Sequence, residues 1–147
     1  MKLFISLLLP QLAGLVGSLF TFSAIPTWYA TLNKPSFNPP NWIFGPVWTT
    51  LYVLMGISLY LVWTKGKKGV ALFKLHLIVN SLWSILFFGL KSPFLGLVTI
   101  IILWMMILAL IKIFWKINKL ASILLWPYLA WVSFATVLNF AILILNA

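Results

Sequence analysis

The sequence predicts an all-α integral membrane protein, a single bundle of five transmembrane helices with an ordered loop capping the outer end. Apolar residues make up 64% of its 147 positions. Only 7% of the residues are charged, all of them lysine, whereas an average soluble domain carries about 25% of both signs. Five apolar runs are long enough to cross a hydrocarbon core, which takes about 20 residues as helix. We therefore interpret residues 1–147 as one membrane domain.

The five predicted helices cover residues 3–22, 43–63, 70–90, 93–115 and 120–145. Their apolar residues are continuous rather than alternating, which indicates helices and not the strands of a membrane barrel. The first run follows Lys2 and so also resembles a secretory signal peptide. It is longer than the usual apolar core of about 7–15 residues, and it has Phe22 where a cut after Ala24 needs a small residue. We therefore retain it as a helix.

The lysines predict how the bundle sits in the membrane. With five crossings, two of them, Lys34 and Lys91, fall at one end. The other eight fall at the amino-terminal end: Lys2, Lys65, Lys67, Lys68, Lys74, Lys112, Lys116 and Lys119. Because cytoplasmic loops carry the excess of positive charge, the amino terminus is predicted to lie in the cytoplasm of a prokaryotic cell. The basic end is also expected to attract the anionic head groups of membrane lipids.

One connection is unusually long. Residues 23–42 join the first two predicted helices, and structureless loops of this length are more often functional or disordered. Disorder is disfavoured because four prolines restrict the backbone and four aromatic side chains supply apolar mass. The segment is therefore predicted to be an ordered cap over the outer end of the bundle.

The composition excludes several kinds of chemistry. The chain has no Asp, Glu or Cys, so it cannot form a paired-carboxylate site, a carboxylate cage for calcium or magnesium, or a thiolate site. His76 is the one histidine and cannot build a zinc site alone. Nucleic acid is not expected as a partner, because the lysines lie between membrane segments and not on a soluble basic face. We expect no metal and no cofactor.

Three predicted helices each present a stripe of aromatic and neutral polar side chains at helical spacing. The stripe residues are Trp48, Tyr52, Met55 and Leu59 in the second helix, His76, Asn80, Ser84, Phe87 and Phe88 in the third, and Tyr128, Trp131, Ala135, Leu138, Asn139 and Ile142 in the fifth. A mainly apolar surface with sparse hydrogen-bonding groups is typical of a small-molecule pocket.

The polar members of these stripes have a structural alternative. Asn80, Ser84 and Asn139 can equally hydrogen-bond between helices, which contributes about 1 kcal/mol each. His76 is interpreted as a neutral histidine near the membrane interface, bonded to a backbone carbonyl. Pro127 is expected to kink the fifth helix.

Three segments resemble a known family. Residues 28–63 read WYATLNKPSFNPPNWIFGPVWTTLYVLMGISLYLVW, residues 80–88 read NSLWSILFF, and residues 127–139 read PYLAWVSFATVLN. Together they resemble the TspO/MBR family of translocator proteins and tryptophan-rich sensory proteins, also known as peripheral-type benzodiazepine receptors. The resemblance extends over essentially the whole chain.

The resemblance implies a five-helix bundle whose first loop closes over a pocket. Members bind porphyrins, and some bind sterols or isoquinoline and benzodiazepine ligands. The positions that contact ligand in the family correspond here to Tyr29, Trp48, Ser84, Phe87, Ala135 and Leu138. At Phe37 this chain departs from the tryptophan that many members have.

The expected function is a membrane receptor or translocator-like protein that binds tetrapyrroles such as protoporphyrin and other haem precursors. The macrocycle is expected to lie against Tyr29, Trp48 and Phe87, with Lys34 pairing with a propionate. One alternative is light-dependent porphyrin degradation, which the resemblance assigns to Trp48. A second is passive transport of hydrophobic ligands. A homodimer is familiar in the family and stays open.

Overall fold

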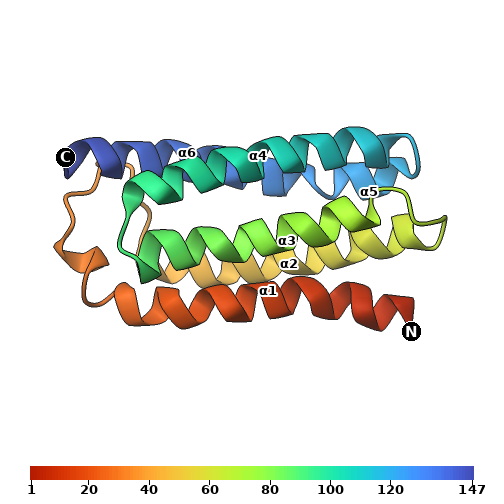
Figure 1. Ribbon diagram of the computed structural model, residues 1–147, viewed down its shortest axis with the longest axis horizontal. Coiled ribbons are helices and arrows are strands. Elements are labelled where there is room, and N and C mark those ends of the chain that lie inside the picture. The colour runs from red at the N-terminus through yellow and green to blue at the C-terminus, as the bar shows by residue number, and fades with distance from the viewer.

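The computed structural model describes all 147 residues and contains helices but no strands. The elements are α1 (Lys2–Ala24), a short 3-10 helix η1 (Tyr29–Thr31), α2 (Asn41–Trp63), α3 (Val70–Ser84), a π-helical turn η2 (Ile85–Gly89), α4 (Pro93–Trp115), α5 (Lys119–Ile123) and α6 (Trp126–Leu145) (Figure 1). Five segments are long and apolar enough to cross a membrane. The chain is thus an all-α integral membrane protein, as its sequence predicts.

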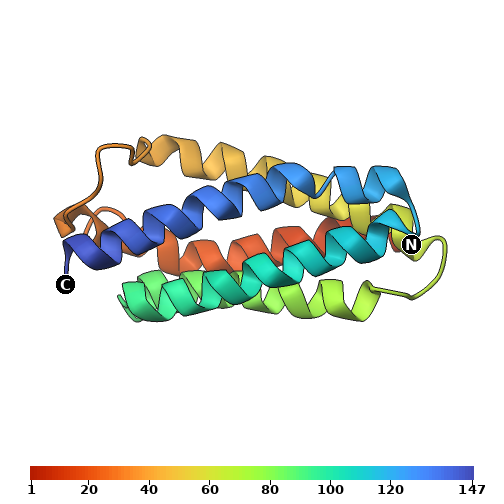
Figure 2. The same ribbon diagram turned by 90° about the horizontal axis from the view of Figure 1, so that it is seen from above.

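The helices run nearly parallel to one long axis and surround a common interior (Figures 1 and 2). Around the bundle, α1 packs against α2 and α3, α3 against α4, and α4 against α6, while α5 contacts α2 and α4. The connection between α1 and α2 covers the end at which the carboxyl terminus lies, opposite the amino terminus. This connection, residues 25–40, is called the lid below.

The end of the bundle near the amino terminus is closely packed. We call it the closed half, built around the fully buried side chains of Met55, Leu59, Phe73, Leu110 and Phe114. A Cβ atom on Gly56 would lie only 2.8 Å from the backbone oxygen of Ser6, so α1 and α2 meet backbone to backbone. Small residues of this kind allow the close approach of membrane helices.

Buried serines join the closed half across helices. The Ser58 hydroxyl of α2 donates to the carbonyl of Ala121 at 2.7 Å, and the Ser122 hydroxyl donates to the carbonyl of Ile111 at 2.7 Å. The short helix α5 is thereby fixed between α2 and α4.

The opposite end, the lid half, is built around two buried phenylalanines of η2, Phe87 and Phe88, and the lid residue Tyr29. The predicted third helix does not continue regularly to residue 90. Its last turn is π-helical, and the Leu90 N–H donates to the Ile85 carbonyl at 2.9 Å. Isolated π-turns are frequent at functional sites in helices.

The fifth predicted span, residues 120–145, is not one helix. It is broken at Leu124 and Leu125, between α5 and α6. Pro127 lacks an N–H, and its ring would clash with the carbonyl four residues earlier, at Ile123, in a continuous helix. The helices α1 and α2 are also longer than predicted, so the lid is shorter than the expected loop 23–42.

Candidate ligand-binding cavity

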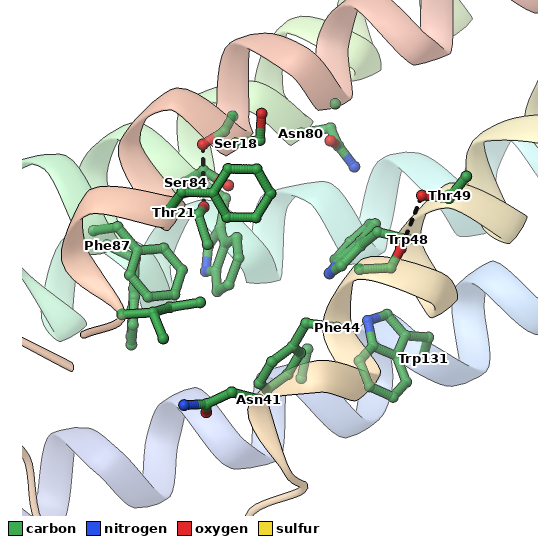
Figure 3. Close-up of a pocket in the computed structure, with 18 of the residues that line it drawn as sticks. Ser18, Thr21, Asn41, Phe44, Trp48, Thr49, Asn80, Ser84, Phe87 and Trp131 are labelled. Carbon is green, nitrogen blue, oxygen red and sulfur yellow. Dashed lines mark hydrogen bonds between the residues drawn. The ribbon is translucent and has the colours of Figure 1, made fainter. Parts of the chain in front are cut away.

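A cavity of about 360 Å³ lies in the lid half (Figure 3). It is lined by residues of α1, α2, α3, η2 and α6 and by Ile25 and Tyr29 of the lid, whereas α4 contributes none. Fifteen of the 26 lining residues are hydrophobic. The volume lies within the range of about 300–1,000 Å³ that is typical of small-molecule sites.

Tyr29 closes the cavity on the lid side. Its ring is buried against Phe88, with ring centroids 5.7 Å apart, and against Phe87 at 6.4 Å. Its hydroxyl donates to the side-chain oxygen of Asn38 at 2.9 Å. Burial raises the pKa of Tyr29 to about 12, although the bond to Asn38 acts in the opposite direction. The hydroxyl is therefore neutral at ordinary pH.

Lys34 supports Tyr29 and does not itself line the cavity. Its ammonium group donates to the carbonyl of Tyr29 at 2.9 Å and to the carbonyl of Leu32 at 3.0 Å. The same group lies 4.9 Å from the centroid of the Tyr29 ring. Because these two carbonyls belong to residues at the beginning and just after the end of η1, the lysine joins both ends of this turn and stabilises the folded lid.

A reciprocal amide pair ties the lid to the end of α6. The backbone N–H of Asn33 donates to the side-chain oxygen of Asn146 at 2.9 Å, and the Asn146 side-chain nitrogen donates to the Asn33 carbonyl at 2.8 Å. We call this pair the lid latch. Sequence reasoning missed it, since no local pattern connects two asparagines 113 positions apart.

Trp48 and Tyr52 of α2 form one wall. Their rings stack with centroids 5.6 Å apart and an interplanar angle of 27°. A side-chain carbon on Gly14 would overlap the Tyr52 ring, so the glycine in α1 makes room for this wall. The edge of Trp48 also meets Tyr128 at 6.3 Å.

The wall opposite comes from α3, η2 and α6. Phe87 stacks on Trp83, with centroids 5.3 Å apart. The Trp83 indole N–H donates to the side-chain oxygen of Asn139 at 3.0 Å, and the Asn139 amide nitrogen donates to the Pro93 carbonyl at 2.8 Å. Asn139 thus forms hydrogen bonds between helices, which is the structural role considered for it in the sequence analysis. It also lines the cavity.

Trp131 of α6 carries a buried hydrogen-bond donor without a partner. Its indole N–H is inaccessible and makes no hydrogen bond, although the ring packs against Phe44 and Phe134. In Figure 3 the Trp131 ring lies beside Phe44, below Trp48. A buried unpaired donor costs about 1–3 kcal/mol. Because this N–H is inaccessible, an acceptor in the cavity would bond to it only if the Trp131 ring turned toward the cavity.

The structure brings together most of the predicted site. Ten of the eleven predicted residues line the cavity: Tyr29, Trp48, Tyr52, Asn80, Ser84, Phe87, Trp131, Ala135, Leu138 and Asn139. Lys34 is the exception. Sequence reasoning missed the contribution of α1, where Gln11, Ser18 and Thr21 line the cavity. Their spacing places them on one helix face, which is the signal that would have found them.

The cavity opens between two helices. Its exposed lining residues come only from α1 and α2: Leu15, Phe22, Asn41, Gly45 and Thr49. Both helices lie in a membrane span, and so the opening faces the side of the bundle that lipid covers.

Comparison with known proteins agrees with this architecture. The sequence model of the TspO/MBR family matches residues 6–145. The tryptophan-rich protein TspO of Archaeoglobus fulgidus is 49% identical, over 100% of this chain and 98% of that protein. The translocator protein of Homo sapiens is 38% identical, over 92% and 84%. The tryptophan-rich sensory protein of Cereibacter sphaeroides is 38% identical, over 81% and 77%. The chain therefore belongs to the TspO/MBR family.

Proposed function

We propose that this protein is a membrane receptor or translocator that binds a flat tetrapyrrole such as protoporphyrin in the cavity of the lid half. Membership of the TspO/MBR family supports the receptor or translocator role. The observation that carries the proposal is the cavity itself, which measures about 360 Å³ and is lined by the aromatic rings of Tyr29, Trp48 and Phe87. Such a site favours a flat apolar ligand.

The walls suit a macrocycle. Trp48 and Phe87 present aromatic rings from opposite sides, and Tyr29 covers the ligand from the lid. A propionate oxygen of the porphyrin would accept the Trp131 N–H if the Trp131 ring turned toward the cavity. The opening between α1 and α2 allows the edge of a macrocycle to extend beyond the enclosed volume.

We further propose that Lys34 pairs with a propionate at the lid. Its ammonium group uses two of its three hydrogens on the carbonyls of Tyr29 and Leu32, and the chain has no acidic side chain to neutralise it. Lys34→Ala should weaken protoporphyrin binding and reduce its salt dependence, whereas Lys34→Arg should retain both. Unchanged affinity and salt dependence in Lys34→Ala would rule out the contact.

A titration of protoporphyrin against tryptophan fluorescence in detergent tests the site. Trp131→Phe should raise the dissociation constant by about three- to tenfold, the contribution of one hydrogen bond. Trp104→Phe is the matched control, because the Trp104 indole donates to Ser133 at 2.8 Å outside the cavity. Absence of saturable quenching in the unmodified protein would contradict the proposed function.

Light-dependent porphyrin degradation is the second candidate. The stacked pair of Trp48 and Tyr52 at the cavity wall favours it, because oxidisable aromatic rings would lie against the bound macrocycle. Illumination of the complex distinguishes the two functions. A stable porphyrin absorption band indicates binding alone. Protein-dependent loss of the band that Trp48→Phe abolishes indicates an enzyme.

The amino terminus is proposed to face the cytoplasm of a prokaryotic cell, on the basis of the lysine distribution. The chain lacks cysteine, so single cysteines give a clean test. An impermeant maleimide should label Ser36→Cys in the lid of intact cells, and Thr64→Cys only after lysis. If Thr64→Cys is labelled in intact cells and Ser36→Cys only after lysis, the orientation is the opposite of the one proposed.

A further inference from the structure

The half-buried Tyr52 and three buried side chains form a continuous hydrogen-bonded relay from the cavity wall into the closed half. Tyr52 Oη lies 2.9 Å from Asn80 Oδ1, and Asn80 Nδ2 lies 2.8 Å from Tyr128 Oη. Tyr128 Oη lies 3.1 Å from His76 Nε2, and His76 Nδ1 lies 2.6 Å from the Phe73 carbonyl oxygen. The first two residues line the cavity, whereas Tyr128 and His76 do not.

The Phe73 carbonyl determines which way the hydrogens of the relay point. A carbonyl only accepts, so His76 Nδ1 must carry a hydrogen. The ring is fully buried, and the chain has no acidic group to pair with an imidazolium, so a charged ring would be costly. In the neutral ring Nε2 then has no hydrogen, and it accepts the hydroxyl hydrogen of Tyr128.

This direction of the hydrogen bonds determines the orientation of the Asn80 side-chain amide. Because the single hydrogen of the Tyr128 hydroxyl is used on His76, Tyr128 Oη can only accept from Asn80, which requires Asn80 Nδ2 to face it. Asn80 Oδ1 is then turned toward Tyr52, whose hydroxyl donates to it. With the amide reversed, its oxygen would face Tyr128 with no hydrogen between the two atoms.

The consequence appears at the cavity wall. An amide nitrogen has two hydrogens, and Asn80 uses one on Tyr128, so one N–H remains. Figure 3 shows the Asn80 side chain directed into the cavity, toward Trp48. We propose that His76, although outside the cavity, holds Asn80 as a hydrogen-bond donor toward the ligand, and that the cavity therefore selects flat ligands that carry an acceptor such as a carbonyl oxygen. This inference rests on the proposed ligand-binding function.

His76 is thus a positioning residue. This role can be distinguished by experiment from a purely structural role, in which the hydrogen bond between His76 and Tyr128 only holds two helices together. Loss of a link would weaken the binding of every ligand alike. Loss of the relay would instead let the Asn80 amide reverse, and it would change the preference for a ligand with an acceptor over one without. The ratio of two dissociation constants therefore separates the two roles.

Fluorene and 9-fluorenone provide the matched probes, since both are flat, neutral and nearly equal in size, and only fluorenone has a carbonyl. We would measure both by tryptophan quenching of the full chain in a Trp48→Phe and Trp131→Phe background, which removes the two indole N–H groups of the cavity lining that have no hydrogen-bond partner. Fluorenone should bind about three- to tenfold more tightly than fluorene. His76→Leu should bring this ratio close to one with little change for fluorene.

His76→Gln is the conservative control, because a glutamine amide can donate to the Phe73 carbonyl and accept from Tyr128, and it should restore the preference. If fluorenone shows no preference, or if the preference survives in His76→Leu, the proposal is wrong. If protoporphyrin quenches the fluorescence saturably but neither probe binds, the inferred preference for ligands with an acceptor is wrong, whereas the proposed function stands. If protoporphyrin fails as well, the cavity itself is no ligand site, and both proposals fall.

The tautomer gives an independent test that needs no ligand. His76 is the only histidine, so nitrogen-15 histidine labelling reports this ring alone by NMR. The relay requires a protonated Nδ1 and an unprotonated Nε2. The opposite tautomer, or a doubly protonated ring at neutral pH, would overturn the proposal even if the variants behave as expected.

Discussion

The closed half and the lid half of this bundle contain the same five spans but are packed in opposite ways. In the closed half Gly56 lets α1 and α2 meet at their backbones, and serine hydroxyls of α2 and α5 bond to neighbouring carbonyls. In the lid half, large rings such as Trp48, Trp83 and Phe87 stand between the helices and leave a cavity.

The difference follows from the physics of a membrane. Lipid tails are as apolar as leucine, so helices gain little from burying apolar surface, and close packing must hold them together. The closed half supplies that packing through small residues. The lid half can then keep its helices apart while the bundle stays assembled, and specific bonds such as Trp83 to Asn139 hold the walls of its cavity in place. The cavity is therefore preformed rather than opened by ligand.

The largest expected effect comes from removing the close approach in the closed half. Gly56→Ala would place a Cβ atom 2.8 Å from the Ser6 backbone oxygen, which cannot move away as a side chain could. We expect it to lower the free energy of unfolding by about 1–3 kcal/mol, as overpacking does.

Gly45→Ala in the lid half is the matched control, since nothing lies within 4 Å of its added carbon. It should leave stability unchanged or slightly raised. Unfolding of both variants in mixed micelles of detergent and denaturant measures the difference, and equal stabilities would mean that the two halves are not packed differently.

A smaller effect is expected at the lid latch. Asn146→Ala removes both bonds between Asn146 and the backbone of Asn33, worth about 1 kcal/mol each. We expect faster hydrogen exchange in residues 25–40 and several-fold faster dissociation of protoporphyrin, with global stability nearly unchanged. Exchange mass spectrometry together with stopped-flow release measures both, and an unaltered release rate would show that the ligand does not leave past the lid.

The smallest effect should appear as a dependence on pH. Burial raises the pKa of Tyr29 from 10.0 to about 12, so the closed lid keeps this proton at pH values where a released lid has lost it. Closure is therefore fully favoured below pH 10.0 and weakens as the pH rises toward about 12. Protoporphyrin release should accelerate over this window. Tyr29→Phe should not show this acceleration of release. If the release rate of Tyr29→Phe depends on pH as that of the unmodified protein does, other titrating groups cause the acceleration.

Much of the fold and of the site could be predicted because both depend on helical spacing. The length of the apolar runs fixes the spans, and residues three and four apart share a face, so Trp48 and Tyr52 or Ala135 and Leu138 had to line the same interior. The break before Pro127 was predicted only as a kink, because spacing does not tell whether neighbouring helices support a bent helix or a separate short one.

What could not be predicted depends on contacts between distant residues. The lid latch, the missing partner of Trp131 and the carbonyl contacts of Lys34 have no local pattern. His76 was expected near the interface and bonded to a backbone carbonyl. The carbonyl bond to Phe73 is confirmed, but the ring is fully buried, because α6 brings Tyr128 over it and so excludes solvent.

The central claim is that ligand occupies the cavity of the lid half, and filling that cavity tests it most directly. Ala135 is buried and lines the cavity, whereas Ala130 lies on the same helix, exposed and outside it. Ala135→Phe should abolish saturable binding of protoporphyrin while the protein stays folded, and Ala130→Phe should bind as the unmodified protein does. Unchanged protoporphyrin affinity in a folded Ala135→Phe protein would contradict the account.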